Sequence, residues 1–147
     1  MGDLAIKSEF GYVVICFVLS VFINMWHGHK VGGARKLYKV NYPATYLVEL
    51  EEGTGKITQD NAFNCYQRAH QNFLENYFAY MGLMFLGGLQ YPIESAVAGL
   101  VYLLGRVVYA IGYMSGDPKK RLWGSFQYIG ILALIALAIA SAVELLR

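Results

Sequence analysis

Long stretches of this sequence contain no charged residue, and each is long enough to form a membrane-spanning helix. No Asp, Glu, Lys or Arg occurs in 10–29, 76–93 or 122–143, and Arg106 is the one charge within 95–116. A helix needs about 20 apolar residues to cross a hydrocarbon core of about 30 Å. Lipid offers no partner to open backbone groups, so a spanning segment should be helical. The pattern therefore predicts an all-α integral membrane protein.

These stretches predict four transmembrane helices, arranged up and down as a four-helix bundle, near residues 10–30, 64–90, 93–115 and 122–145. One long polar loop, at about 31–63, joins the first two helices. We expect a single domain that covers residues 1–147. Glycine and proline mark the expected connections, at Gly32-Gly33, Tyr91-Pro92 and Gly116-Asp117-Pro118.

Composition agrees with a membrane protein and excludes several other classes. Hydrophobic residues make up 56% of the 147 positions and charged residues 15%, against about 25% charged in a typical soluble domain. The chain is too apolar for a disordered segment and too poor in cysteine for a disulfide scaffold. Its net charge of +2 is too small to indicate a nucleic-acid partner. We expect Cys16 and Cys65 to be buried thiols, and we expect no metal site.

Basic residues are distributed unequally between the two predicted sides of the membrane. Nine lie in the first and third connections and at the adjoining helix ends, whereas only Lys7 and Arg147 lie on the other side. Cytoplasmic loops carry the excess of Lys and Arg in membrane proteins. We therefore expect the long loop to face the cytoplasm and both termini to lie on the opposite side.

Polar residues inside the predicted helices point to a site. Arg68, Asn72 and Glu75 fall within about 60° of one another on a helix, hence on one face. The third helix carries a second one-sided row, composed of Tyr102, Arg106, Tyr109 and Tyr113. An arginine at mid-membrane costs at least about 2.5–3.5 kcal/mol, so Arg106 should face the bundle and find a partner. We expect that partner to be Glu75.

Two explanations of these residues remain open. A buried ion pair with a ladder of hydroxyl groups would hold two helices in register without further function. Alternatively, the polar groups converge on a mixed-charge cleft, because Arg35, Lys36 and Arg121 flank the same end of the bundle. Such a cleft suits a small anion that also carries an amine, with the amine at Glu75 and carboxylates at the arginines. His70 is a candidate general base or a simple hydrogen-bonding residue.

Four blocks of sequence resemble one family of membrane proteins, in the right order and over nearly the whole chain. The blocks are Ala34-Arg-Lys-Leu-Tyr-Lys-Val40 with Tyr42-Pro43, Phe63-Asn-Cys-Tyr-Gln-Arg-Ala-His-Gln-Asn-Phe-Leu-Glu75, Gly105-Arg-Val-Val-Tyr-Ala-Ile-Gly-Tyr113 and Ser115-Gly-Asp-Pro-Lys-Lys-Arg121. The family is that of membrane-associated proteins in eicosanoid and glutathione metabolism, abbreviated MAPEG. Within it, the chain most resembles the type-three microsomal glutathione transferases.

The resemblance implies a left-handed four-helix bundle that assembles as a homotrimer, with glutathione bound in clefts between subunits. Members of the family conjugate glutathione to lipophilic electrophiles or reduce lipid hydroperoxides, and some form cysteinyl leukotrienes. By motif, the residues that would hold glutathione from one subunit are Arg68, Asn72, Glu75, Arg106, Tyr109 and Tyr113. Arg35 and His70 would reach in from the neighbouring subunit.

Two cations have implied catalytic roles by the same resemblance. Arg121 would stabilise the glutathione thiolate, and Lys36 would lie near the electrophile. The segment after Tyr113 is one residue longer than in the leukotriene-forming members, so Lys120 competes with Arg121 for the thiolate. Those members also carry tyrosine where this chain has Asn76, and glutamine at the position of His70.

Two non-enzymatic readings are alternatives to a glutathione transferase or peroxidase. The first is a lipid-binding scaffold that presents a fatty acid to a partner enzyme, and the second is a structural subunit of a larger membrane complex. The retained pocket residues argue against the scaffold. The expected location is the endoplasmic reticulum membrane, with the outer mitochondrial membrane as the alternative.

Overall fold

A computed structural model describes residues 6–50, 57–58 and 62–147. The elements in chain order are α1 (Phe10–Leu37), β1 (Glu49–Leu50), β2 (Ile57–Thr58), α2 (Ala62–Gly88), α3 (Pro92–Met114), the 3-10 helix η1 (Pro118–Gly124) and α4 (Gln127–Leu145). The strands pair antiparallel, so the described structure is helical apart from two strands of two residues each. Parts of the predicted loop, 51–56 and 59–61, lie outside the described residues.

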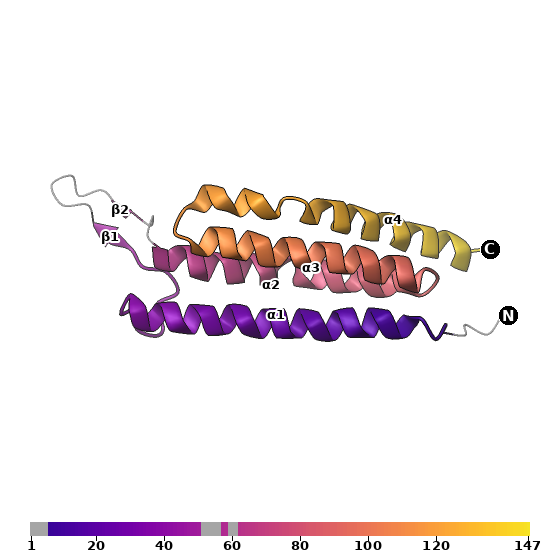
Figure 1. The fold of residues 1–147 in the computed structure, drawn as a ribbon, viewed down its shortest axis with the longest axis horizontal. Helices are drawn as coiled ribbons and strands as arrows, with labels where there is room; N and C mark the ends of the chain where they lie inside the picture. The colour runs from indigo at the N-terminus through magenta and orange to yellow at the C-terminus, as the bar shows by residue number, and fades with distance from the viewer. Residues whose placement is uncertain (1–5, 51–56, 59–61) are drawn as a thin grey trace.

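The four long helices lie side by side in three layers (Figure 1). α2 and α3 form the middle layer, α1 packs against both on one side, and α4 packs against both on the other. The beginning of α1 and the end of α4 lie at one end of the molecule, together with the short turn between α2 and α3, and the strand pair lies at the other end. Consecutive helices therefore run in opposite directions.

Three helices, α1, α3 and α4, are long and apolar enough to cross a membrane. The fourth predicted span is α2, which has 27 residues but carries the polar face described above. Its crossing of the membrane therefore stays a prediction. α3 lies within one residue of its predicted bounds at each end, whereas α1 continues beyond residue 30 to Leu37. Gly32 and Gly33 therefore lie inside a helix and do not mark its end.

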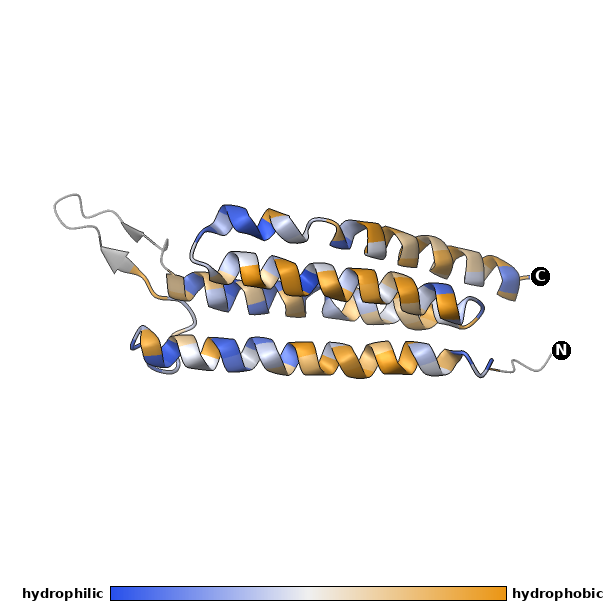
Figure 2. Ribbon diagram, in the orientation of Figure 1, coloured by the Kyte–Doolittle hydropathy of each residue, from blue (hydrophilic) through white to orange (hydrophobic). Residues whose placement is uncertain are grey.

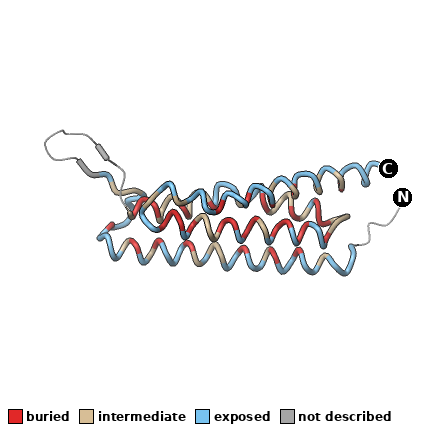
Figure 3. Tube along the Cα trace, turned by 45° about the horizontal axis from the view of Figure 1, so that its top comes forward, coloured by how far each residue is buried: buried red, intermediate tan, exposed pale blue. Residues whose placement is uncertain are grey.

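Large apolar side chains cover the outside of the helices. Phe78 is 87% exposed, Ile129 68% and Phe22 61%, which is the surface that lipid would cover. In Figure 2 apolar colouring dominates α4 and the half of α1 nearer the termini, while polar colouring gathers toward the strand pair. The buried positions face the inside of the bundle (Figure 3). Cys16 and Cys65 are among them, at 2% and 6% exposed, as predicted.

The connection from α3 to α4 shapes the end of the bundle where the basic residues gather. Gly116 has a φ of +89°, a left-handed conformation that glycine adopts without steric cost. Asp117 then caps η1 by accepting a hydrogen bond from the Lys119 backbone N–H at 3.0 Å. The chain predicted as one helix over 122–145 is thus divided, because η1 ends at Gly124 and α4 begins at Gln127.

Candidate functional site

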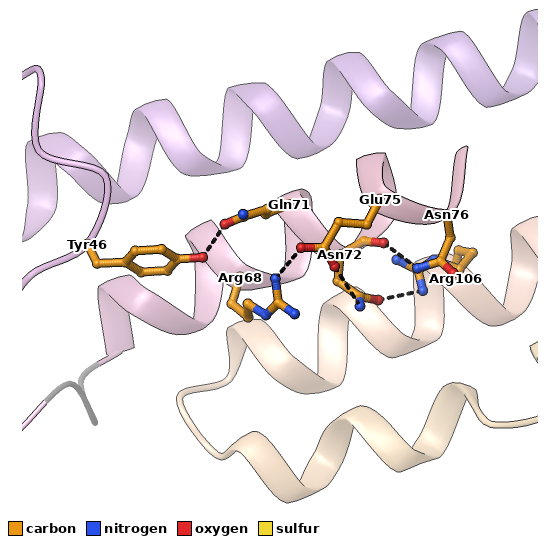
Figure 4. A network of polar contacts seen from close by, with 7 residues as sticks. All are labelled: Tyr46, Arg68, Gln71, Asn72, Glu75, Asn76 and Arg106. Carbon is orange, nitrogen blue, oxygen red and sulfur yellow. Dashed lines mark hydrogen bonds and ion pairs between the residues drawn. The ribbon is translucent and has the colours of Figure 1, made fainter. Parts of the chain in front are cut away.

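Three polar side chains on α2 form a hydrogen-bonded group on one face of that helix, as their spacing predicts (Figure 4). Arg68 Nη1 lies 2.6 Å from Glu75 Oε1, and the Asn72 amide donates to Glu75 Oε2 at 3.5 Å. The Arg68 and Glu75 side chains are 40% and 44% exposed. A pair this exposed contributes only about 0–1 kcal/mol to stability. Both charges therefore remain accessible to a ligand.

Arg106 is buried, as predicted, with 3% of its surface exposed. Its Nη1 donates to Asn72 Oδ1 at 2.9 Å and to Gln127 Oε1 at 3.1 Å. The prediction that Glu75 is its hydrogen-bonding partner is wrong. Asn72 bonds to both residues and so places a neutral amide between the two charges. The guanidinium also lies over the Tyr109 ring, with Cζ 4.8 Å from the ring centroid.

A cleft of about 340 Å³ lies between α2, α3 and the η1–α4 segment. Its volume is at the lower end of the range for small-molecule sites, about 300–1,000 Å³. The residues that line it are Arg68, Asn72, Tyr109, Arg121, Leu122, Ser125, Gln127 and Tyr128. A second hollow of about 220 Å³ shares three of these residues and reaches Arg106 and Asn76. Two exposed cations and a buried one thus converge on connected polar hollows.

Arg121 and Lys120 are the two candidates for stabilising the thiolate, and they differ in their position relative to the cleft. Arg121 lines the cleft, and its Cζ lies 5.6 Å from the centroid of the Tyr113 ring. The Lys120 ammonium lies over the Trp123 ring at 5.8 Å, and Lys120 is not among the cleft residues. The backbone of Lys120 instead packs on α3 at Gly112, where a Cβ atom would collide with the Lys120 carbonyl.

Three predicted site residues, His70, Arg35 and Lys36, lie away from this cleft in the single chain, and Glu75 and Tyr113 are not among the residues that line it. His70 faces α1, where its Nε2 lies 3.0 Å from Asn24 Oδ1. It is two residues from Arg68, hence about 200° around the helix and on the far side. Arg35 and Lys36 lie in the last turn of α1 and line a separate hollow.

Sequence reasoning missed two cleft residues at the start of α4. Gln127 is 3% exposed and bonds to Arg106, and Tyr128 lines both hollows. The sequence does indicate Gln127, because it is the one amide side chain within the uncharged stretch 122–143. An analysis based on charged residues alone misses it, since glutamine carries no charge.

The donor set of the cleft favours an anionic ligand. Arg68 and Arg121 offer charged donors that match carboxylates, while Glu75, which pairs with Arg68 at 2.6 Å but does not itself line the cleft, offers an acceptor for an amine. Within the described ranges, no group of three His, Cys, Asp or Glu side chains is placed to hold a metal ion. The cleft can therefore bind a small zwitterion with excess negative charge and place a cation beside one of its groups.

Comparison with known proteins gives the family. The MAPEG family model matches residues 13–143. Human microsomal glutathione S-transferase 2 is 34% identical over 121 residues, which cover 82% of this chain and 74% of the human protein. The uncharacterized protein sll1147 of Synechocystis sp. is 27% identical over 142 residues, covering 96% and 95% of the two chains. With a family model that spans almost the whole sequence, this chain belongs to the MAPEG family.

Proposed function

We propose that this protein is a membrane glutathione transferase that also reduces lipid hydroperoxides. The observation that carries the proposal is the cleft in which Arg68, Asn72, Tyr109 and Arg121 come together. Glutathione is a tripeptide with two carboxylates, one amine and one thiol, which matches the mixed charge of this site. The family membership and the likeness to a microsomal glutathione S-transferase support the same conclusion.

In this proposal the α2 face binds the tripeptide and Arg121 acts on its sulfur. Glu75 receives the amine, and Arg68 receives a carboxylate. The Asn72 amide would form a further hydrogen bond with the tripeptide between these two groups, and Tyr109 and Tyr113 would contact it from α3. Arg106 would hold the Asn72 side chain in position through its hydrogen bond to Asn72 Oδ1. Arg121 is favoured over Lys120 because it is the one that lines the cleft.

The chemistry requires a thiolate, because a thiol with a pKa of about 8.5 is only a few per cent ionised at neutral pH. Lowering that pKa by about two units requires about 2.7 kcal/mol of preferential stabilisation of the anion. The Arg121 guanidinium would supply it by a charge-assisted hydrogen bond, and an arginine does not itself lose a proton. The thiol proton leaves to solvent.

In conjugation the sulfur bonds to an electrophilic carbon from the bilayer, and the electron pair of the bond that breaks there leaves with the displaced group or, in an addition, moves to the adjacent atom, which takes a proton. In peroxide reduction the sulfur bonds to the terminal peroxide oxygen, the O–O bond breaks and the protonated alcohol leaves; a second glutathione then converts the sulfenic acid to the disulfide and water.

The proposed assembly is a homotrimer of left-handed four-helix bundles in which α2 also crosses the membrane. Arg35 and His70 would then complete the cleft of the next subunit, and Lys36 would stand near the electrophile. This arrangement gives a role to the three predicted residues that lie away from the cleft in a single chain. We place the protein in the endoplasmic reticulum membrane, with the strand-pair end cytoplasmic and the termini opposite.

The test is a glutathione titration of the purified protein, followed by the ultraviolet absorbance of the thiolate. We expect a saturable thiolate signal at neutral pH that Arg121→Ala removes while glutathione still binds. Lys120→Ala is the matched control, since it removes a neighbouring cation that does not line the cleft. Turnover with a lipophilic electrophile should fall with the thiolate signal in Arg121→Ala and stay normal in Lys120→Ala.

Other results would change the assignment. Normal turnover in Arg121→Ala together with loss in Lys120→Ala would exchange the two roles, and normal turnover in both would remove the cationic-thiolate mechanism. Glutathione binding raises thermal stability by mass action, by about 2.7 kcal/mol at a hundredfold excess over Kd. If glutathione produces neither a thiolate signal nor thermal stabilisation, the result favours the lipid-binding scaffold or the structural subunit.

A further inference from the structure

Gln127 is buried at the start of α4, and the protein uses only one half of its side-chain amide. The residue is 3% exposed, and its Oε1 accepts a hydrogen bond from Arg106 Nη1 at 3.1 Å. An arginine carries donors and no acceptor, so this contact fixes which end of the amide faces Arg106. The amide nitrogen and its two N–H groups therefore point away from Arg106.

The Gln127 amide nitrogen donates to no acceptor within the described residues. It is also not closed off by protein, unlike the Nε and Nη2 atoms of Arg106. Gln127 lines both the cleft of about 340 Å³ and the smaller hollow beside it. The unused N–H groups of a buried amide thus face a space that a ligand can enter.

Asn72 on α2 has the same orientation relative to Arg106. Its Oδ1 accepts a hydrogen bond from Arg106 at 2.9 Å, and its amide nitrogen donates to Glu75 Oε2 at 3.5 Å. Arg106 therefore turns the oxygens of two amides toward itself and their N–H groups away. The Asn72 amide already has an acceptor in the protein, whereas the Gln127 amide has both donors free for a ligand.

The position of Gln127 is fixed before any ligand binds. A Cβ atom added at Gly105 would lie 2.6 Å from Gln127 Cβ and 2.8 Å from its Cα, so the start of α4 lies directly on α3. The hydrogen bond to Arg106 then holds the far end of the side chain. A donor held in this way loses little freedom when it binds an anion.

The groups of the proposed ligand are divided between two sides of the cleft. In the proposed function Arg68 and Glu75, both on α2, receive a carboxylate and the amine. Arg121 receives the sulfur and comes from the η1–α4 segment, as Gln127 does. The sulfur is also the one group of the tripeptide that gains a negative charge in the reaction. It is therefore the group that an unused donor from this segment suits.

We infer that Gln127 is a second donor to the glutathione sulfur, beside Arg121. This inference rests on the proposed function. The amide N–H bonds more strongly to an anion than to a neutral atom, so it favours the thiolate over the thiol. Because the amide carries no charge, it adds to the effect of Arg121 and does not replace it. The two halves of the amide then have different roles, since the oxygen holds Arg106 and the nitrogen holds the sulfur.

The experiment compares glutathione with the analogue in which a methyl group replaces the thiol. Calorimetry on the full-length protein in detergent measures the binding of both, and ultraviolet absorbance of the thiolate against pH gives the pKa of the bound thiol. Gln127→Met removes the whole amide. At about pH 8 it should weaken glutathione binding about five- to tenfold more than binding of the analogue, and raise the pKa of the bound thiol by about 0.7–1 unit.

A second variant separates the two halves of the amide. Gln127→Glu keeps an oxygen for Arg106 but has no N–H group, so it should unfold later than Gln127→Met and still raise the pKa of the bound thiol. Gly87→Ala is the control for lost stability. Its added Cβ would lie 3.1 Å from Leu137 Cβ, near the turn between α2 and α3, and it should change neither the thiol pKa nor the ratio of the two affinities.

Two results would overturn the inference. Equal losses for glutathione and its analogue in Gln127→Met would mean that the amide acts through Arg106 or on another part of the tripeptide. An unchanged thiol pKa in both Gln127 variants would mean that its N–H groups do not reach the sulfur.

Failure of the proposed function gives a different pattern. A parent protein that binds no glutathione, or forms no thiolate on it, would remove the proposed function and this inference together. A thiolate that is lost in Arg121→Ala but keeps the parent's pKa in Gln127→Met would remove the second donor alone.

Discussion

Replacing Gln127 by leucine tests how the bundle tolerates a buried arginine. Arg106 Nη1 has two acceptors, Asn72 Oδ1 and Gln127 Oε1. Its Nε and Nη2 atoms are buried without a hydrogen-bond partner among the described residues. Gln127→Leu removes one of the two acceptors from a guanidinium that already has too few. We expect the variant to be less stable although leucine suits its apolar surroundings.

Two sets of measured energies bound the expected loss. A hydrogen bond to a charged group in a soluble protein contributes about 1.5–3 kcal/mol. Interhelical hydrogen bonds in a membrane protein average about 0.6 kcal/mol and reach about 1.7. Arg106 is 3% exposed and charged, so the upper part of the membrane range applies. We therefore expect Gln127→Leu to lower the unfolding free energy by about 1–2 kcal/mol.

The assay is unfolding by a denaturing detergent, followed by tryptophan fluorescence and helical circular dichroism. Tyr128→Phe is the control, since Tyr128 lines the same hollows, is 62% exposed and, unlike Asn72 and Gln127, accepts no hydrogen bond from Arg106 in the described structure. Its effect should stay within about 0.5 kcal/mol. The double variant Arg106→Leu/Gln127→Leu should lose less than the sum of its single changes, because removing both partners leaves no unpaired charge.

The reasoning would be refuted by strict additivity in that double variant. It would also be refuted by a Gln127→Leu protein as stable as the parent. Either result would mean that water or another group satisfies Arg106 equally well, and that Gln127 makes no net contribution to holding α4 against α3.

Two further predictions concern the α2 face and the contact between α3 and α4. Glu75→Gln keeps the shape of the side chain but loses its charge, so glutathione should bind about three- to tenfold more weakly in calorimetry, with Arg68→Lys as a comparison that retains charge. Gly130→Ala should lower the unfolding midpoint, because its Cβ would lie 2.6 Å from the Tyr102 nitrogen. Gly82→Ala is its control and should stabilise the protein by up to about 1 kcal/mol, since nothing lies within 4 Å there; the opposite order of the two midpoints would contradict the packing.

The helices were predictable where local chemistry alone decides their bounds. α3 begins at Pro92, which suits the first turn of a helix, and its predicted and observed bounds agree within a residue. α1 was predicted too short because Gly32 and Gly33 were expected to end it. Glycine weakens a helix by only about 1 kcal/mol each, and here the helix continues for four residues after Gly33.

The candidate site was predictable only within a single helix. Arg68, Asn72 and Glu75 share a face because their angular spacing is fixed by the helix itself. The partner of Arg106 depends on how α2 rotates against α3 and on what α4 contributes, and neither follows from spacing. A neutral amide from each neighbouring helix therefore took the place expected for Glu75.

The division between η1 and α4 explains how one short segment contributes both a cation and an amide to the same cleft. Arg121 and Gln127 are six positions apart, which in a continuous α-helix sets them about 120° apart around the axis. The turn between the two helices removes that constraint, and both side chains line the cleft. A turn in a membrane protein needs its backbone buried in protein or in contact with water. Gly124 meets that need, because its missing side chain lets η1 lie directly on the α3 backbone, where a Cβ atom would come within 2.5 Å of the Tyr109 nitrogen.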